Sequence, residues 1–120
     1  MAVAITAFLT VVASADIALQ DWIPSVLDMP DDAEIVADRQ IGSTIRMFSF
    51  STQENGADLL REWQQTLQDN GYIINSARDD LIENAVEFSG NGINNAKILA
   101  TSVAGEAGNQ TLIEFDATLQ

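Results

Sequence analysis

The chain has 120 residues, with 18 acidic against five basic side chains and a net charge of −13. Such a charge repels nucleic acid and anionic membranes, so no nucleic-acid partner is expected. The sequence has no cysteine and no histidine, which excludes disulfides, thiolate or imidazole metal ligands, and Ser-His-Asp or Cys-His catalysis. We therefore expect a single domain without metal or cofactor. The excess of acids indicates either a saline environment or ordinary compositional drift.

The run from Met1 to Val12 is almost wholly apolar, and Ala13-Ser14-Ala15 and the polar Asp16 follow it. This pattern is typical of the core and cleavage site of a secretory signal peptide, although no Lys or Arg precedes the run. The run is too short to cross a bilayer as a helix, so stable membrane insertion is not expected. The sequence thus predicts a signal peptide over residues 1–15 and one periplasmic or secreted bacterial domain over 16–120. The alternative is a buried N-terminal helix or strand.

Residues 16–33 predict an irregular lead-in. Pro24 interrupts a helical spacing of apolar residues, and a short helix over Pro24–Asp28 is expected. Pro30-Asp31-Asp32 predicts a turn. Asp31, Asp32 and Glu34 are candidate cation ligands, but they lack the D-x-D-x-D-G spacing of a calcium loop. We interpret them as a solvated turn.

Two strands are predicted next, Glu34–Ala37 and Ile41–Ser51, with a hairpin at Asp38-Arg39-Gln40. Side chains alternate across a strand, so one face of the longer strand carries Arg46, Phe48 and Phe50. We expect the two phenylalanines to lie under a helix. The opposite face carries Ile45 and Met47.

One amphipathic helix is predicted from Asn55 to Gly71. Asn55 can cap the amino end, Asp58 lies where the helix dipole favours negative charge, and Gly71 suits the left-handed residue that ends a helix. A stripe at three- and four-residue spacing is formed by Leu59, Leu60, Trp63 and Leu67. Trp63 is interpreted as a core anchor rather than a ligand-stacking residue.

Four further strands are predicted: Tyr72–Asn75, Ala85–Ser89, Lys97–Val103 and Gln110–Thr118. The order β-β-α-β-β-β-β predicts an α+β fold in which one main helix packs on an antiparallel sheet of about five to six strands.

The densest polar stretch is Ser89 to Lys97, with turn formers at Gly90 to Asn95. A glycine-rich turn can direct backbone N–H groups at an anion, and Lys97 can assist. The alternative is a plain hairpin connection. With Arg46, which can pair with an acidic ligand or a neighbouring acid, the candidate binding residues are Arg46, Asn91, Asn94, Asn95 and Lys97.

Paired carboxylates are the remaining catalytic option, because carboxylates alone can hydrolyse glycosides. The candidates are Asp79, Asp80, Glu83 and Glu87. No apolar cleft is evident around them, and we interpret them as a solvated acidic connection. No catalytic residue is predicted.

A resemblance covers about Pro30 to Thr118 and rests on Pro30 to Val36, Gly42 to Phe50, Leu60 to Tyr72 with Trp63, and Phe88-Ser89-Gly90. This order resembles small exported bacterial proteins of unassigned function, with a Pro-x-x-Ala turn before strands, one helix and a closing meander. The resemblance implies export but no catalytic residues. We expect a non-enzymatic binding or envelope-associated protein with an unidentified ligand or protein partner. The alternatives are a carboxylate-dependent hydrolase and a structural subunit that self-associates through an edge strand. The oligomeric state expected is a monomer or a weak homo-oligomer.

Overall fold

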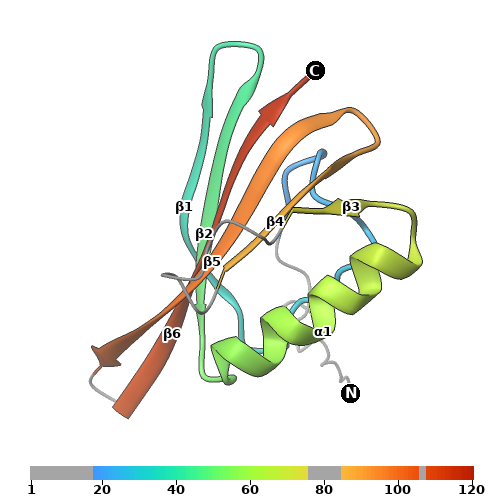
Figure 1. The fold of residues 1–120 in the computed structure, drawn as a ribbon. Helices are drawn as coiled ribbons and strands as arrows, with labels where there is room; N and C mark the ends of the chain where they lie inside the picture. The colour runs from blue at the N-terminus through green and yellow to red at the C-terminus, as the bar shows by residue number, and fades with distance from the viewer. Residues whose placement is uncertain (1–17, 76–84, 106–107) are drawn as a thin grey trace, which may run out of the picture.

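The computed structural model describes residues 18–75, 85–105 and 108–120 (Figure 1). These residues form a single-domain α+β fold, with one helix and a six-stranded sheet, which confirms the predicted fold class. The predicted signal peptide, residues 1–15, lies outside the described residues.

All neighbouring strands are antiparallel, and their order across the sheet is β1-β2-β6-β5-β4-β3. Pairing of β2 with β6 joins the first hairpin to the last and places Phe48 opposite Phe115 at the centre of the sheet. The strand bounds are β1 Glu34–Ile41, β2 Ile45–Thr52, β3 Ile73–Ile74, β4 Ala85–Gly90, β5 Ile93–Gly105 and β6 Gly108–Leu119.

The helix α1 (Gly56–Asp69) begins and ends as predicted. The Asn55 side chain accepts a hydrogen bond of 2.9 Å from the Asp58 N–H, which satisfies one of the free donors of the first turn. At the other end Gly71 has φ +89°, and the N–H groups of Gly71 and Tyr72 donate to the carbonyls of Gln68 and Leu67. This is a Schellman motif, which requires the left-handed conformation that glycine adopts without strain.

Helix α1 packs on β3, β4, β5 and β6, and its apolar stripe is buried against one face of the sheet (Figure 1). Phe48 and Phe50 are 1% and 0% exposed, and the Phe50 ring centroid lies 6.5 Å from that of Trp63 on α1; Phe48 contacts Phe50 and Phe115. Trp63 is the core anchor: its ring centroid lies 5.7 Å from that of Phe115, and its indole N–H donates to the Asp28 carbonyl at 3.2 Å. Burial of Trp63 therefore fixes the lead-in segment as well as the helix.

Residues 18–33 cover the same face of the sheet beside α1. They contain turns, so the predicted helix over Pro24–Asp28 is wrong. The buried side chain of Gln20, rather than a helix, anchors this segment to the sheet. Its Nε2 donates to Asp38 Oδ1 at 2.7 Å and to the Arg39 and Met47 carbonyls, and its Oε1 accepts from the Trp22 indole at 2.6 Å. The segment is thus tied to both strands of the first hairpin.

Two predicted boundaries are wrong. Asp38-Arg39-Gln40 continues β1, and the hairpin turn is Gly42–Thr44, where Gly42 has φ +64°. The other error is the start of β5, which is Ile93 rather than Lys97. Asn91 and Gly92 both have positive φ and form a two-residue hairpin loop between Gly90 and Ile93. Two positive φ values at an Asn-Gly pair are typical of a type I′ turn, which leaves residues 93–96 to the strand.

Candidate functional site

Among the residues that the structure describes, one face of the sheet is covered and the other is open. The covered face lies under α1 and residues 18–33, and the open face is the opposite side. Along β2 the covered face carries Phe48 and Phe50, so Ile45 and Met47 lie on the open face, where both are 37% exposed. An antiparallel sheet with one solvated face usually presents polar residues there. This open face mixes apolar and charged groups, and it is therefore the candidate site.

Strand register places five residues of the open face in one line across the sheet. The pairs are Arg39 with Met47, Met47 with Asp116, Asp116 with Lys97, and Lys97 with Glu87. Directly opposite side chains in an antiparallel pair lie about 4.5–5.5 Å apart at Cβ and interact. We call this line the charged row; its charges alternate in sign on either side of Met47.

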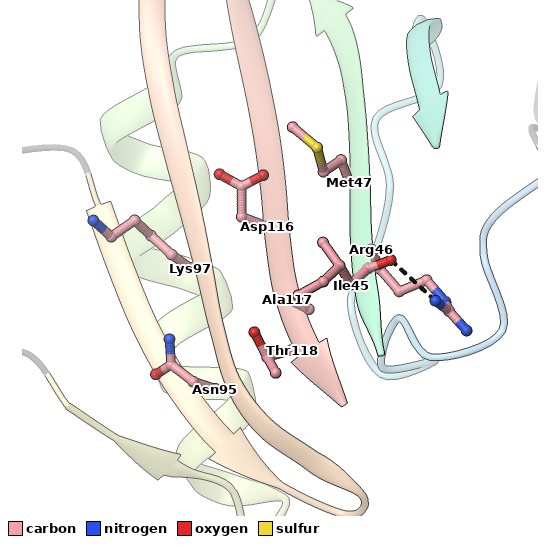
Figure 2. Close-up of a pocket in the computed structure, with 8 residues that line it drawn as sticks. All are labelled: Ile45, Arg46, Met47, Asn95, Lys97, Asp116, Ala117 and Thr118. Atoms are coloured by element: carbon pink, nitrogen blue, oxygen red, sulfur yellow. Dashed lines mark hydrogen bonds between the residues drawn. The ribbon is translucent and has the colours of Figure 1, made fainter. Parts of the chain in front are cut away.

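Beside the charged row, a second line of residues reaches the end of the strands. Register pairs Ile41 with Ile45, Ile45 with Thr118 and Thr118 with Asn95. The open face has a hollow of about 380 Å³, which is bordered by residues of the charged row and of this second line (Figure 2). The hollow is lined by Ile45, Arg46, Met47, Asn95, Lys97, Asp116, Ala117 and Thr118. It offers an ammonium group, a carboxylate, an amide and a hydroxyl beside two apolar side chains.

Lys97 lies between two acidic residues of this surface, Glu87 and Asp116. Its Nζ lies 3.6 Å from Glu87 Oε2 on β4, and the register places Asp116 of β6 on its other side. Both members of the Lys97–Glu87 pair are partly sheltered, with side chains 31% and 22% exposed. At 3.6 Å this ion pair is loose. Partial shelter reduces screening by salt, so Lys97 can still attract an incoming carboxylate.

The structure brings two of the five predicted binding residues together, Asn95 and Lys97, on the open face. Arg46 is separated from them: its backbone borders the hollow, but its side chain extends away from the other lining residues (Figure 2). The guanidinium donates to the carbonyls of Gly42, Ser43 and Ile45, so it stabilises the first hairpin turn. It forms no ion pair with the residues that the structure describes.

The other two predicted binding residues, Asn91 and Asn94, lie outside the hollow, in the β4–β5 turn and at the start of β5. Asn91 is exposed in the β4–β5 turn, with φ +50°, and Asn94 is exposed where a register shift occurs between Ile93 and Asn95. The glycine-rich stretch is therefore a hairpin, which was the alternative interpretation, and its asparagines are divided between turn and strand.

Sequence reasoning missed Asp116, Thr118, Ile45 and Met47 as parts of one surface with Asn95 and Lys97. Alternation predicts only that Ile45 and Met47 lie on the face opposite Phe48. The missing information was the β2–β6 and β5–β6 register. The Asn91-Gly92 turn signal could have supplied only the β4–β5 register, which pairs Lys97 with Glu87.

Of the four candidate carboxylates, Glu87 is the one among the described residues. Glu87 is paired with Lys97, whereas Asp79, Asp80 and Glu83 lie outside the described residues. Asp32 accepts hydrogen bonds from the Thr52 hydroxyl at 2.5 Å and from the Gln53 N–H at 2.8 Å, so it closes the end of β2. Within residues 18–75, 85–105 and 108–120, no group of acidic side chains is arranged to hold a metal ion.

Among the same residues, no helix is both long and apolar enough to cross a membrane. Comparison of the chain with protein-family models, with curated proteins and with solved structures gave no match.

Proposed function

We propose that this protein is a non-enzymatic binding domain that docks a protein partner on the open face of its sheet. The observation that carries the proposal is the charged row, in which Asp116 and Lys97 alternate beside exposed Met47 and Ile45. Protein interfaces combine apolar contacts with complementary charges, which give specificity and orientation. The covered face, by contrast, is already filled by the helix and the lead-in segment.

The shape of the site supports binding to a broad partner. Ser49 and Ser51 of β2 lie on the same face beside the charged row, and both carry small side chains. Among the residues that line the hollow, Asp116 is the one acid, so no second carboxylate is placed there for general acid–base catalysis. The hollow therefore suits recognition of a partner's side chains better than hydrolysis.

Site-specific photo-crosslinking tests this proposal. A photoreactive amino acid replaces Thr118 on the open face in one variant and Gln65 on the outer side of α1 in the control; both are exposed or half-exposed. In an extract of the cells that make the protein, we expect discrete protein adducts from position 118 and none from position 65. Unlabelled wild-type protein should compete with the adducts, and an Asp116→Lys variant should compete much less. Equal adducts from both positions, or equal competition by both competitors, would refute the proposal.

We also propose that the domain acts outside the cytoplasm, as a periplasmic or secreted bacterial protein. The support is the apolar run Met1–Val12 with Ala13-Ser14-Ala15 after it. Mass spectrometry of the native protein should find a new amino terminus at Asp16. A native protein that retains Met1 in the cytosol would contradict export.

A further inference from the structure

We infer that the partner of the open face is a second copy of this chain, which stacks on it face to face about a two-fold axis. This inference rests on the proposed use of the open face for protein binding and names its occupant. The two-fold axis runs parallel to the strands, between β5 and β6, so that β6 of each copy lies over β5 of the other.

Charge pairing is self-complementary about this axis. Because Asp116 of β6 lies opposite Lys97 of β5 within one chain, exchange of the two strands places each Asp116 over the Lys97 of the other copy. The neighbouring register pair, Thr118 with Asn95, is exchanged in the same way and brings a hydroxyl to an amide. A two-fold interface requires this reciprocity, in which residue i contacts j and j contacts i. Stacked sheets lie about 10 Å apart and cross at about 30°, so the pairs nearest the axis fit best.

The open face is the part of this acidic chain that a second copy can approach. Its described residues carry two bases, Arg39 and Lys97, and four acids, Glu34, Glu87, Glu114 and Asp116, for a net charge of −2. The whole chain carries −13, so most of the negative charge lies elsewhere. Two open faces therefore repel each other less than the more acidic remainder of the chain would.

The area is sufficient for a weak dimer. The strands β1, β2, β6, β5 and β4 make the face about 24 Å wide, at about 4.8 Å per strand, and seven residues make it about 23 Å long. Each copy would then bury about 550 Å², or about 1,100 Å² for both, close to the lower limit of about 1,000 Å² for a specific interface. The apolar contribution comes from Ile41, Ile45, Met47, Leu99 and Leu112, which all lie on this part of the face.

The edge of the sheet is a poorer place for self-association. β1 exposes Ile35 and Val36, but the ladder is irregular between Ile35 and Ala37, and a bulge hinders pairing with another strand. Moreover, the Arg39 carbonyl on β1 accepts a hydrogen bond from Gln20. The stacked arrangement uses the undisturbed part of the sheet instead.

A charge-swap experiment tests the inference. Asp116→Lys alone places lysine over lysine across the axis, and Lys97→Asp alone places aspartate over aspartate, so each variant should be monomeric where the wild type is dimeric. A one-to-one mixture of the two variants restores opposite charges at both positions and should recover the dimer. Neighbouring charges within one chain remain unfavourable in the mixture, so recovery can only come from contact between chains. Asp69→Lys and Arg61→Asp, on the exposed side of α1, make the same charge changes and should leave the dimer intact.

Analytical ultracentrifugation at about 0.15 M salt, where the Debye length is about 8 Å, gives the readout. A wild type that stays monomeric to about 1 mM overturns the inference. So does a mixture that fails to recover a dimer that the wild type forms, or single variants that dimerise normally. Photo-adducts with a different protein at position 118 would then still support the proposed binding function.

Cross-linking keeps the test decisive if either charge variant does not fold. The natural chain has no cysteine, so Thr118→Cys on one chain and Asn95→Cys on another can be joined by a bis-maleimide of about 10 Å, the separation of stacked sheets. Cross-links should form between these two chains and not between Gln65→Cys chains. A higher yield between Val36→Cys chains would instead show pairing through the β1 edge and refute the stacked dimer.

Discussion

Gly56 begins α1 where the helix lies directly against Ala100 of β5 and Thr111 of β6. A Cβ atom at this position would lie 2.7 Å from Ala100 Cβ and 3.0 Å from Thr111 Cγ2. Contacts below 3.0 Å between carbon atoms require something to move, and the Ala100 methyl group cannot rotate away. We therefore predict that Gly56→Ala destabilises the fold, although alanine is the better helix former.

The magnitude follows from two opposing terms. Replacing glycine by alanine within a helix stabilises by about 0.5–1 kcal/mol, and less at the first helical residue. Insertion of a methyl group into a packed contact costs about 1–3 kcal/mol, because α1 or β5 must shift. The expected result is a net loss of about 1–2 kcal/mol in the free energy of unfolding.

Urea denaturation followed by tryptophan fluorescence measures this loss, since Trp63 is buried on the same helix. Gly71→Ala is an informative comparison, because no atom lies within 4 Å of its added Cβ and its cost would come from φ alone. Ala100→Gly should weaken the effect of Gly56→Ala in a double-mutant cycle, with a coupling energy of at least about 0.5 kcal/mol. A stabilised Gly56→Ala protein would refute the close approach of α1 to β5.

Four further perturbations test the remaining parts of the fold. Trp63→Ala should cost about 3–5 kcal/mol in denaturant unfolding, and a loss below about 1 kcal/mol would mean that the ring is not buried. Gln20→Leu should cost about 2–3 kcal/mol, because it leaves the Asp38 carboxylate and the Trp22 N–H without their partner; an unchanged midpoint would exclude this anchor. Asn55→Ala should cost about 1 kcal/mol through loss of the helix cap, whereas Asn55→Ser should be nearly neutral in the same assay. The melting temperature should rise from about 0.01 to 1 M sodium chloride as the Debye length falls from about 30 to 3 Å, and a flat response in a second, less excluded salt would mean that the acids are paired.

The local signals in the sequence predicted the parts of the fold that depend on neighbours in the chain. Asn55, Asp58 and Gly71 marked the ends of α1, and alternation separated Phe48 from Met47. The first hairpin was misplaced because Asp38 and Gln40 are polar residues within a strand. Asp38 is held there by Gln20, 18 residues earlier, and a contact of that range leaves no local pattern.

The candidate site was harder to predict because the pairing register of the strands determines which side chains lie next to one another in it. Lys97 was identified from its own loop, but its neighbours Asp116 and Met47 come from strands that lie far from it in the sequence. A slip of one residue in β6 would turn Asp116 inward and replace it with a residue of the core. Only the pairing of three strands shows that these side chains form one surface. For Arg46 the alternation along the strand predicted the correct face. That face is the covered one, so Arg46 lies on the opposite side of the sheet from Lys97.

The distribution of charge connects the fold to the proposed dimer. A chain with 18 acids must expose most of them, because buried carboxylates need partners and only five bases are present. The positions of the five basic residues therefore indicate which parts of the surface a second acidic chain can approach closely. Arg61 pairs with Asp58 on the outer side of α1, and Arg46 stabilises a turn, whereas Arg39 and Lys97 lie on the open face beside Met47. The open face thus combines a small net charge with exposed apolar side chains, and these two properties together favour contact with another copy of the same chain.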